Sequence, residues 1–115
     1  MHYTRIYSDK SGESHFEKID IDLTEEGPLG ALSEVFKARA VQFRENSADY
    51  YWDYHNPPSK QFIILLDGVI EITTSLGEKR LFSGGDILLL EDLEGKGHRT
   101  EHLKKEKRKS VFIQL

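Results

Sequence analysis

The sequence of 115 residues contains no cysteine, which excludes disulfides, a thiolate nucleophile and any cysteine-based zinc site. Any bound metal would therefore need nitrogen and oxygen ligands. Long apolar runs are also absent, because the longest one, Phe62–Leu66, is far too short to span a bilayer. The first residues lack the basic start and apolar core of a secretory signal, so the expected location is cytoplasmic.

The charge is slightly acidic, with 20 acidic and 16 basic residues and a formal net charge of −4. Nucleic-acid binding relies on clustered Lys and Arg, and we interpret the one basic cluster, residues 104–109, as a charged turn between two strands. Hydrophobic residues make up 37% and charged residues 31%, which is typical of a globular chain. We therefore expect neither nucleic acid nor a membrane as a partner.

Short runs of β-forming residues recur along the chain, and clusters of Gly, Pro, Asn, Asp and Ser interrupt them. This alternation predicts an all-β protein. At this length we expect a single domain that covers residues 1–115. The segment 29–36 has apolar residues at helical spacing, and its sequence is compatible with either a short helix or an irregular edge segment.

The dipeptide Asp67-Gly68 lies between two apolar runs, Gln61–Leu66 and Val69–Thr74. Because Asp-Gly is a favoured two-residue turn, the two runs are predicted to pair as an antiparallel hairpin. Both faces of the first run are largely apolar, which indicates a strand that is covered on both sides. The outer cover is expected to be another part of the chain or a second subunit, and we predict a homodimer.

A first group of polar residues lies at about residues 53–68. His55 is followed by a five-residue spacer, Gln61, six further residues and Gly68. This order resembles the first motif of the cupin family, in which two histidines, a glutamate and a glycine follow one another. In this sequence Asp53 replaces the first histidine, glutamine replaces the glutamate, and the spacer is one residue longer.

A second group, at about residues 85–102, resembles the second cupin motif. Gly85-Asp86 opens a strand, Gly95-Lys96-Gly97-His98 follows, and His102 lies where the family has an asparagine. The usual proline is missing, and the linking loop is two residues longer than usual. The resemblance runs from about residue 40 to the end and implies a double-stranded β-helix, a jelly-roll (cupin) sandwich of two antiparallel sheets.

In cupins the two motifs meet at one end of the jelly roll and bind one divalent metal. The resemblance therefore implies a metal site for Fe, Ni, Zn or Mn, formed by His55, His98, Gln61 and Asp53. Because glutamine is neutral, its presence in place of glutamate should weaken the binding of a dication. Without a metal, Gln61 is expected to orient a polar ligand through hydrogen bonds, and no cofactor is needed.

Strand alternation predicts which neighbouring side chains face the same site. Tyr51, Asp53 and His55 are expected to face the pocket together, because alternate residues of a strand point to one side. For the same reason His98, Thr100 and His102 share one face of a second strand. The predicted ligand contacts are Tyr51, Gln61, Thr100 and His102.

The leading functional hypothesis is a protein that binds a small polar molecule in the jelly roll, with or without a weakly held metal. The first alternative is a small cupin enzyme, either a metal-dependent dioxygenase or a metal-free sugar-nucleotide isomerase, with His55 and His98 as ligands or proton-transfer groups. The second alternative is a structural or regulatory protein whose interior is filled by side chains. The residues identify no substrate.

Overall fold

A computed structural model describes all 115 residues, and all of its regular elements are strands. In chain order these are β1 (His2–Ser8), β2 (Ser14–Asp20), β3 (Glu25–Gly27), β4 (Gly30–Leu32), β5 (Ala40–Asn46), β6 (Tyr51–His55), β7 (Gln61–Leu65), β8 (Val69–Thr74), β9 (Lys79–Ser83), β10 (Ile87–Leu90), β11 (His98–His102) and β12 (Arg108–Gln114). The all-β prediction is thereby confirmed, and segment 29–36 contains no helix. No part of the chain forms an apolar helix long enough to cross a bilayer.

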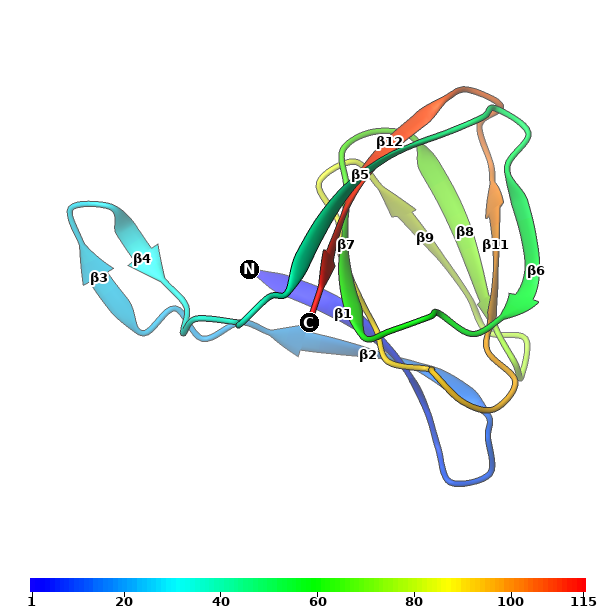
Figure 1. Cartoon of the computed structure of the whole chain (residues 1–115), viewed down its shortest axis with the longest axis horizontal. Coiled ribbons are helices and arrows are strands. Elements are labelled where there is room, and N and C mark those ends of the chain that lie inside the picture. The colour runs from blue at the N-terminus through cyan, green and yellow to red at the C-terminus, as the bar shows by residue number, and fades with distance from the viewer.

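Two sheets form the body of the molecule (Figure 1). The strand order is β2-β1-β10-β7-β12-β5 in the larger sheet and β6-β11-β8-β9 in the smaller one. The neighbours pair antiparallel except for β1 and β10, which run parallel. Apolar side chains from both sheets pack in one core, which includes Ile6, Ile63, Leu65, Ile70, Ile72 and Leu88. The chain is therefore an all-β jelly-roll sandwich.

The Asp67-Gly68 turn joins the two sheets, so the predicted hairpin is wrong. β7 pairs with β10 and β12, whereas β8 pairs with β11 and β9. A type I′ turn needs positive φ at both central residues, and only Gly68 has it, at 73°. Asp67 instead accepts a hydrogen bond on Oδ1 from the backbone N of Lys109 (2.6 Å), which ties this crossing to the start of β12.

Strand β7 is covered on both faces, and the outer cover comes from the same chain. The ring of Phe62 packs edge-on against Tyr3 and Phe36, with ring centroids 5.2 and 5.4 Å apart. Ile63 and Leu65, on the opposite face, belong to the core between the sheets. Contacts within one protomer therefore account for the apolar residues on both faces of β7, without a second subunit.

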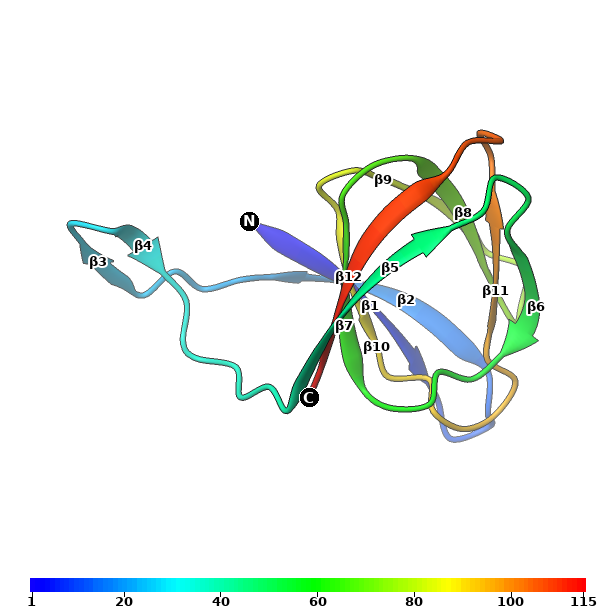
Figure 2. The ribbon, with the colours of Figure 1, turned by 45° about the horizontal axis from the view of Figure 1, so that its top comes forward.

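The β3–β4 hairpin extends away from the body as an arm (Figures 1 and 2). All residues of both strands are exposed. Leu29 at its turn is 86% exposed and Val35, just after it, is 88% exposed. The arm therefore adds nothing to the core and carries apolar surface that its own chain leaves uncovered.

Candidate ligand-binding site

A pocket of about 200 Å³ lies between the two sheets. Its middle is aliphatic, formed by Ile63, Leu65, Ile70, Ile72, Leu88 and Leu90. Polar side chains line its two ends. We call them the histidine end, with His55, Gln61 and His98, and the arginine end, with Arg44 and Arg108. No Asp or Glu lines the pocket.

His55 and His98 lie side by side at the histidine end, with ring centroids 4.6 Å apart. Trp52 stacks on the His55 ring at 3.8 Å and nearly parallel to it, with 5° between the planes. His55 Nδ1 donates a hydrogen bond to the carbonyl O of Asp53 (2.9 Å). Burial lowers the pKa of His55, and neighbouring His98 lowers this pKa further, so the His55 ring is neutral at pH 7.

His98 is oriented by a buried carboxylate. Its Nδ1 donates to Asp92 Oδ2 over 2.6 Å, and Asp92 is fully buried. A histidine held through Nδ1 in this way keeps one ring orientation and leaves Nε2 for a ligand in the pocket. Asp92 lies in the loop before β11. Acidic residues in loops are usually exposed to solvent, so the sequence contains no signal that this one is buried.

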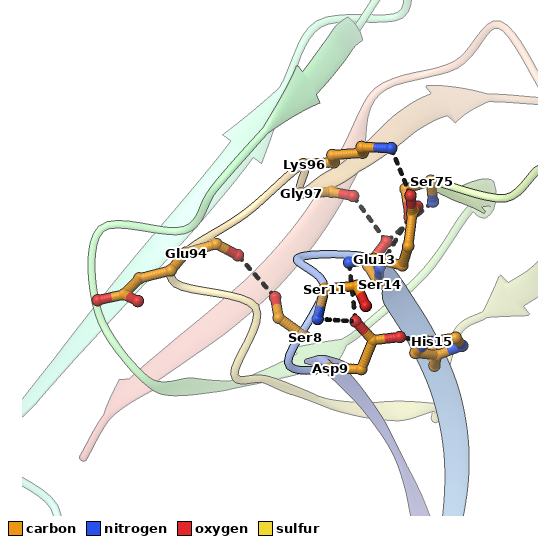
Figure 3. Close-up of polar contacts among 10 residues, drawn as sticks. All are labelled: Ser8, Asp9, Ser11, Glu13, Ser14, His15, Ser75, Glu94, Lys96 and Gly97. Carbon is orange, nitrogen blue, oxygen red and sulfur yellow. Dashed lines mark hydrogen bonds and ion pairs between the residues drawn. The ribbon is translucent and has the colours of Figure 1, made fainter.

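The β1–β2 turn holds the loop that leads into His98 (Figure 3). Ser8 Oγ donates to the carbonyl O of Glu94 (2.6 Å), and Ser14 Oγ donates to the carbonyl O of Gly97 (2.7 Å). Ser14 and the second of these bonds are buried. The N-terminal hairpin therefore positions the residue next to His98 from outside the pocket.

Gly97 brings this loop against the end of β6. It has a φ of +69°, and a Cβ at this position would lie 2.0 Å from the carbonyl O of His55. Its neighbour His98 is the register partner of His55. The absence of a side chain at residue 97 thus allows the two histidines to approach each other.

The pocket brings together His55, Gln61, His98 and Thr100, whose functional roles remain predictions. Tyr51 and Asp53 do not line it, contrary to the expected face, and Tyr51 is 53% exposed. The cause is an irregular pairing of β6 with β11. Thr100 pairs with Trp52 and His98 pairs with His55, so three residue positions on β6 lie opposite two on β11 and β6 contains one extra residue. This bulge turns Trp52 and His55 to the same side.

His102 lies behind the arginine end, outside the pocket lining. Its Nε2 accepts a hydrogen bond from Arg108 Nε (3.0 Å), so it contacts a pocket residue and not the pocket itself. Burial lowers the pKa of His102, and the charge of Arg108 lowers it further. The sequence patterns missed the pocket residues Trp52, Arg44 and Arg108.

The histidine end offers a metal two imidazoles and one amide oxygen. Gln61 Oε1 is buried without a hydrogen-bond partner, but the Asp53 carboxylate is outside the pocket and Asp92 is bonded to His98. No group of three or more His, Cys, Asp or Glu side chains could hold a metal ion. Protein sites for divalent transition metals normally supply at least three strong ligands. These residues do not fit a tightly held dication, and metal binding stays a prediction.

At the arginine end, Arg108 is 1% exposed. Its Nη2 donates to Asn46 Oδ1 (2.9 Å), and Nη1 is buried without a partner. Arg44 lies over the ring of Phe112, 4.3 Å from its centroid, and donates from Nε to Ser110 Oγ (3.2 Å). Burial, followed by the charge of Arg44, lowers the pKa of Arg108 to about 10. Both guanidinium groups are therefore charged at pH 7.

No protein-family model matches the sequence, and no curated protein matches it. Among solved structures, the fold is similar to protein NMB1881 from Neisseria meningitidis, with a TM-score of 0.50 and 18% identity over 71% of this chain and 80% of that one. A structure provisionally named ethanolamine utilization protein q, from Salmonella typhimurium LT2, has a TM-score of 0.44 and 11% identity over 99% of this chain and 94% of that one. The first likeness supports the fold alone, and the second is too weak to add to it. Fold and pocket together define an all-β jelly roll with an internal pocket.

Proposed function

We propose that this chain is a small-molecule-binding cupin and that a small polar ligand occupies the pocket between its sheets. The observation that carries the proposal is the buried Oε1 of Gln61, which lines the pocket and has no hydrogen-bond partner in the protein. Buried polar atoms are almost always hydrogen-bonded, so a group inside the pocket is expected to supply the partner. His55 and His98 line the same end.

The size of the pocket bears on the alternatives. At about 30 Å³ per water molecule, 200 Å³ holds about six or seven waters, which argues against an interior filled by side chains. The same volume suits an organic molecule with few carbon atoms. It is small for a sugar nucleotide, because pockets for larger ligands enclose roughly 300–1,000 Å³. The sugar-nucleotide isomerase alternative therefore finds no support in the pocket.

A metal-free enzyme that moves a proton on a small substrate is the second candidate. The hydrogen bond between Asp92 and His98 favours it, because a histidine that is oriented by a carboxylate is typical of general acid–base catalysis. The role of His98 would be to take or give a proton at Nε2. A metal-dependent dioxygenase is less well supported, since the histidine end supplies few ligands.

Ligand binding can be tested through the intrinsic fluorescence of a pocket residue. Trp52 is the only tryptophan and lines the pocket, so its fluorescence should change as small polar compounds saturate the site. We expect Gln61→Met to weaken binding about tenfold, because an unpaired buried polar group costs about 1–3 kcal/mol. The ligand-free variant should be at least as stable as wild type. Glu101→Gln, outside the pocket, is the control and should bind normally.

Two outcomes would contradict this proposal. The first is equal affinity in wild type and Gln61→Met, which would remove the contact that carries the proposal. The second concerns the metal: elemental analysis of untagged protein, purified without chelator, should find well below one equivalent. Near-stoichiometric metal that disappears in His55→Ala would favour the dioxygenase instead.

We also propose that the chain forms a homodimer in which the arm of one protomer covers the partner. The outer face of the six-stranded sheet has an apolar groove lined by Tyr3, Ile21, Ser33, Phe36, Phe62, Ile64, Ile87, Ile113 and Leu115. Phe62 in this groove is already covered by Tyr3 and Phe36, but Ile64, Ile87 and Ile113 beside it are only partly buried. In a two-fold symmetric dimer, each arm would cover the groove of the other protomer, so both apolar surfaces of each chain would be buried. A cytoplasmic location is part of the proposal and rests on the sequence.

The dimer proposal predicts a mass of twice 13.3 kDa in sedimentation equilibrium at micromolar concentration. The double variant Leu29→Asp, Val35→Asp should sediment as a monomer, because two charges cannot be buried at an apolar contact without a partner. Leu81→Asp is the control, since Leu81 lies on β9, outside the arm, and is also an exposed apolar residue, at 58%. A wild-type monomer, or dissociation by the control variant as well, would contradict the arm contact.

A further inference from the structure

The arginine end of the pocket carries two guanidinium groups, and no Asp or Glu lines the pocket beside them. We propose that the ligand is a small carboxylic acid, bound as its anion, whose carboxylate is held by Arg108 and Arg44. This inference rests on the proposed function, because it names the ligand class of the same pocket.

Arg108 is a buried cation that forms no ion pair, and the nearest carboxylate influence on its pKa comes from Asp67, which does not line the pocket. Its two hydrogen bonds go to neutral groups, Nε to His102 and Nη2 to Asn46, and its Nη1 has no partner. The ion pairs of the protein include neither Arg108 nor Arg44. Buried charges in proteins are normally paired, so an anion is the missing component.

Arg44 adds a second guanidinium from the neighbouring strand. Arg44 on β5 is the register partner of Ser110 on β12, two residues from Arg108, and both arginines line the pocket. Contacts with Phe112 and Ser110 hold Arg44 in place. The two positive charges repel each other, and a carboxylate between them would relieve this repulsion while forming charge-assisted hydrogen bonds.

The rest of the pocket selects an organic acid over an inorganic anion. Its aliphatic middle offers nothing to a fully polar ion, but it suits a short carbon chain. At the far end, Gln61 Oε1 is a free acceptor and calls for a hydrogen-bond donor on the ligand, such as a hydroxyl.

The length of the pocket sets the length of the acid. His98 and His102 are four residues apart on β11, or about 13 Å along the strand, and His102 contacts Arg108. The long side chain of arginine shortens the free distance between the ends. Together with a volume of about 200 Å³, this indicates a hydroxy acid of about four to six carbons.

The test is a titration followed by Trp52 fluorescence, with 4-hydroxybutyrate and 5-hydroxypentanoate as probes. Their neutral amides and inorganic phosphate are the comparison compounds. We expect at least one acid to saturate the signal and its amide to bind at least tenfold more weakly. Arg108→Met and Arg44→Gln should each weaken binding of the acid at least tenfold, while Arg80→Gln, on the surface strand β9, should not.

Stability separates binding from a structural role for Arg108. Arg108→Met removes a buried charge that has no ion pair and also removes the hydrogen bonds to Asn46 and His102, so the two effects oppose each other and the melting temperature of the ligand-free variant should stay close to that of wild type. A large fall in melting temperature, with acid binding intact in Arg44→Gln, would overturn the proposal. Arg108→Lys keeps the charge and should recover part of the binding lost in Arg108→Met.

The remaining outcomes distinguish the two proposals. Binding of amides as tight as that of acids, sensitive to Gln61→Met, would overturn the carboxylate and leave the proposed pocket function intact. Tighter binding of phosphate than of any acid would also overturn the carboxylate. If no acid or amide changes the fluorescence or the melting temperature at millimolar concentration, the carboxylate inference fails together with the proposed function.

Discussion

Gly97→Ala should destabilise the protein by about 3 kcal/mol or more. The new Cβ would lie 2.0 Å from the carbonyl O and 2.4 Å from the carbonyl C of His55, which are backbone atoms that cannot rotate away. The left-handed φ of +69° adds a conformational cost of about 1–3 kcal/mol for a residue with a side chain. Urea unfolding followed by circular dichroism measures the loss.

Gly77→Ala is the matched control for this experiment. Gly77 also has a positive φ, at 90°, but a Cβ there would meet nothing within 4 Å. We therefore expect only the conformational cost, about 1 kcal/mol. If Gly97→Ala were no more destabilising than Gly77→Ala, the close approach of residue 97 to His55 would not exist in solution.

In the Gly97→Ala molecules that still fold, we expect a second effect, on ligand binding. The clash can be relieved only by moving the loop away from β6, and this movement separates His98 from His55. We expect ligand binding at the histidine end to weaken in that fraction although neither histidine is changed. The glycine thus links the stability of the fold to the geometry of the pocket.

His98→Ala should be the second large effect, with a loss of about 3–5 kcal/mol, because it leaves the Asp92 carboxylate buried without its partner. The double variant His98→Ala, Asp92→Ala should lose less than the sum of the two single variants, since neither group is then left alone. A double-mutant cycle measured by urea unfolding gives this coupling directly.

The chain contains a control for the buried pair. His15 Nε2 contacts Asp9 Oδ2 over the same 2.6 Å, but both side chains are partly exposed. His15→Ala should therefore have a small effect, because water can replace the lost partner. Equal losses for His98→Ala and His15→Ala would show that burial of the Asp92–His98 pair contributes nothing. Because His98→Ala is expected to unfold readily, Gln61 is the better position for binding studies.

The local sequence predicted the two central strands well and their pairing partners less well. The run Val69–Thr74 is β8, and Gln61–Leu66 is β7 with one residue fewer. Their order of apolar and turn-forming residues is a property of neighbouring residues, which a single sequence contains. Which strand lies beside which depends on contacts across the whole chain, and for this reason the Asp67-Gly68 turn was assigned to the wrong partner.

The face of β6 shows a similar limit. Strict alternation predicts Tyr51 and Asp53 beside His55, whereas the extra residue opposite β11 brings Trp52 to that side. The register with the neighbouring strand determines where such a bulge lies, so the alternation of residues along β6 alone cannot predict it. On β11 the same alternation predicted His98 and Thr100, which both line the pocket, but also His102, which does not line it.

The sequence by itself determined that the chain is all-β, and the resemblance of its two motifs to those of cupins placed His55, Gln61 and His98 in one predicted site. Only the tertiary structure decided that the pocket has an arginine end. Arg108 belongs to the basic cluster 104–109, which composition alone describes as a solvated turn, but it is the first residue of β12 and is 1% exposed. A charged residue is buried only when the surrounding strands enclose it, and that enclosure is produced by residues distant in the sequence.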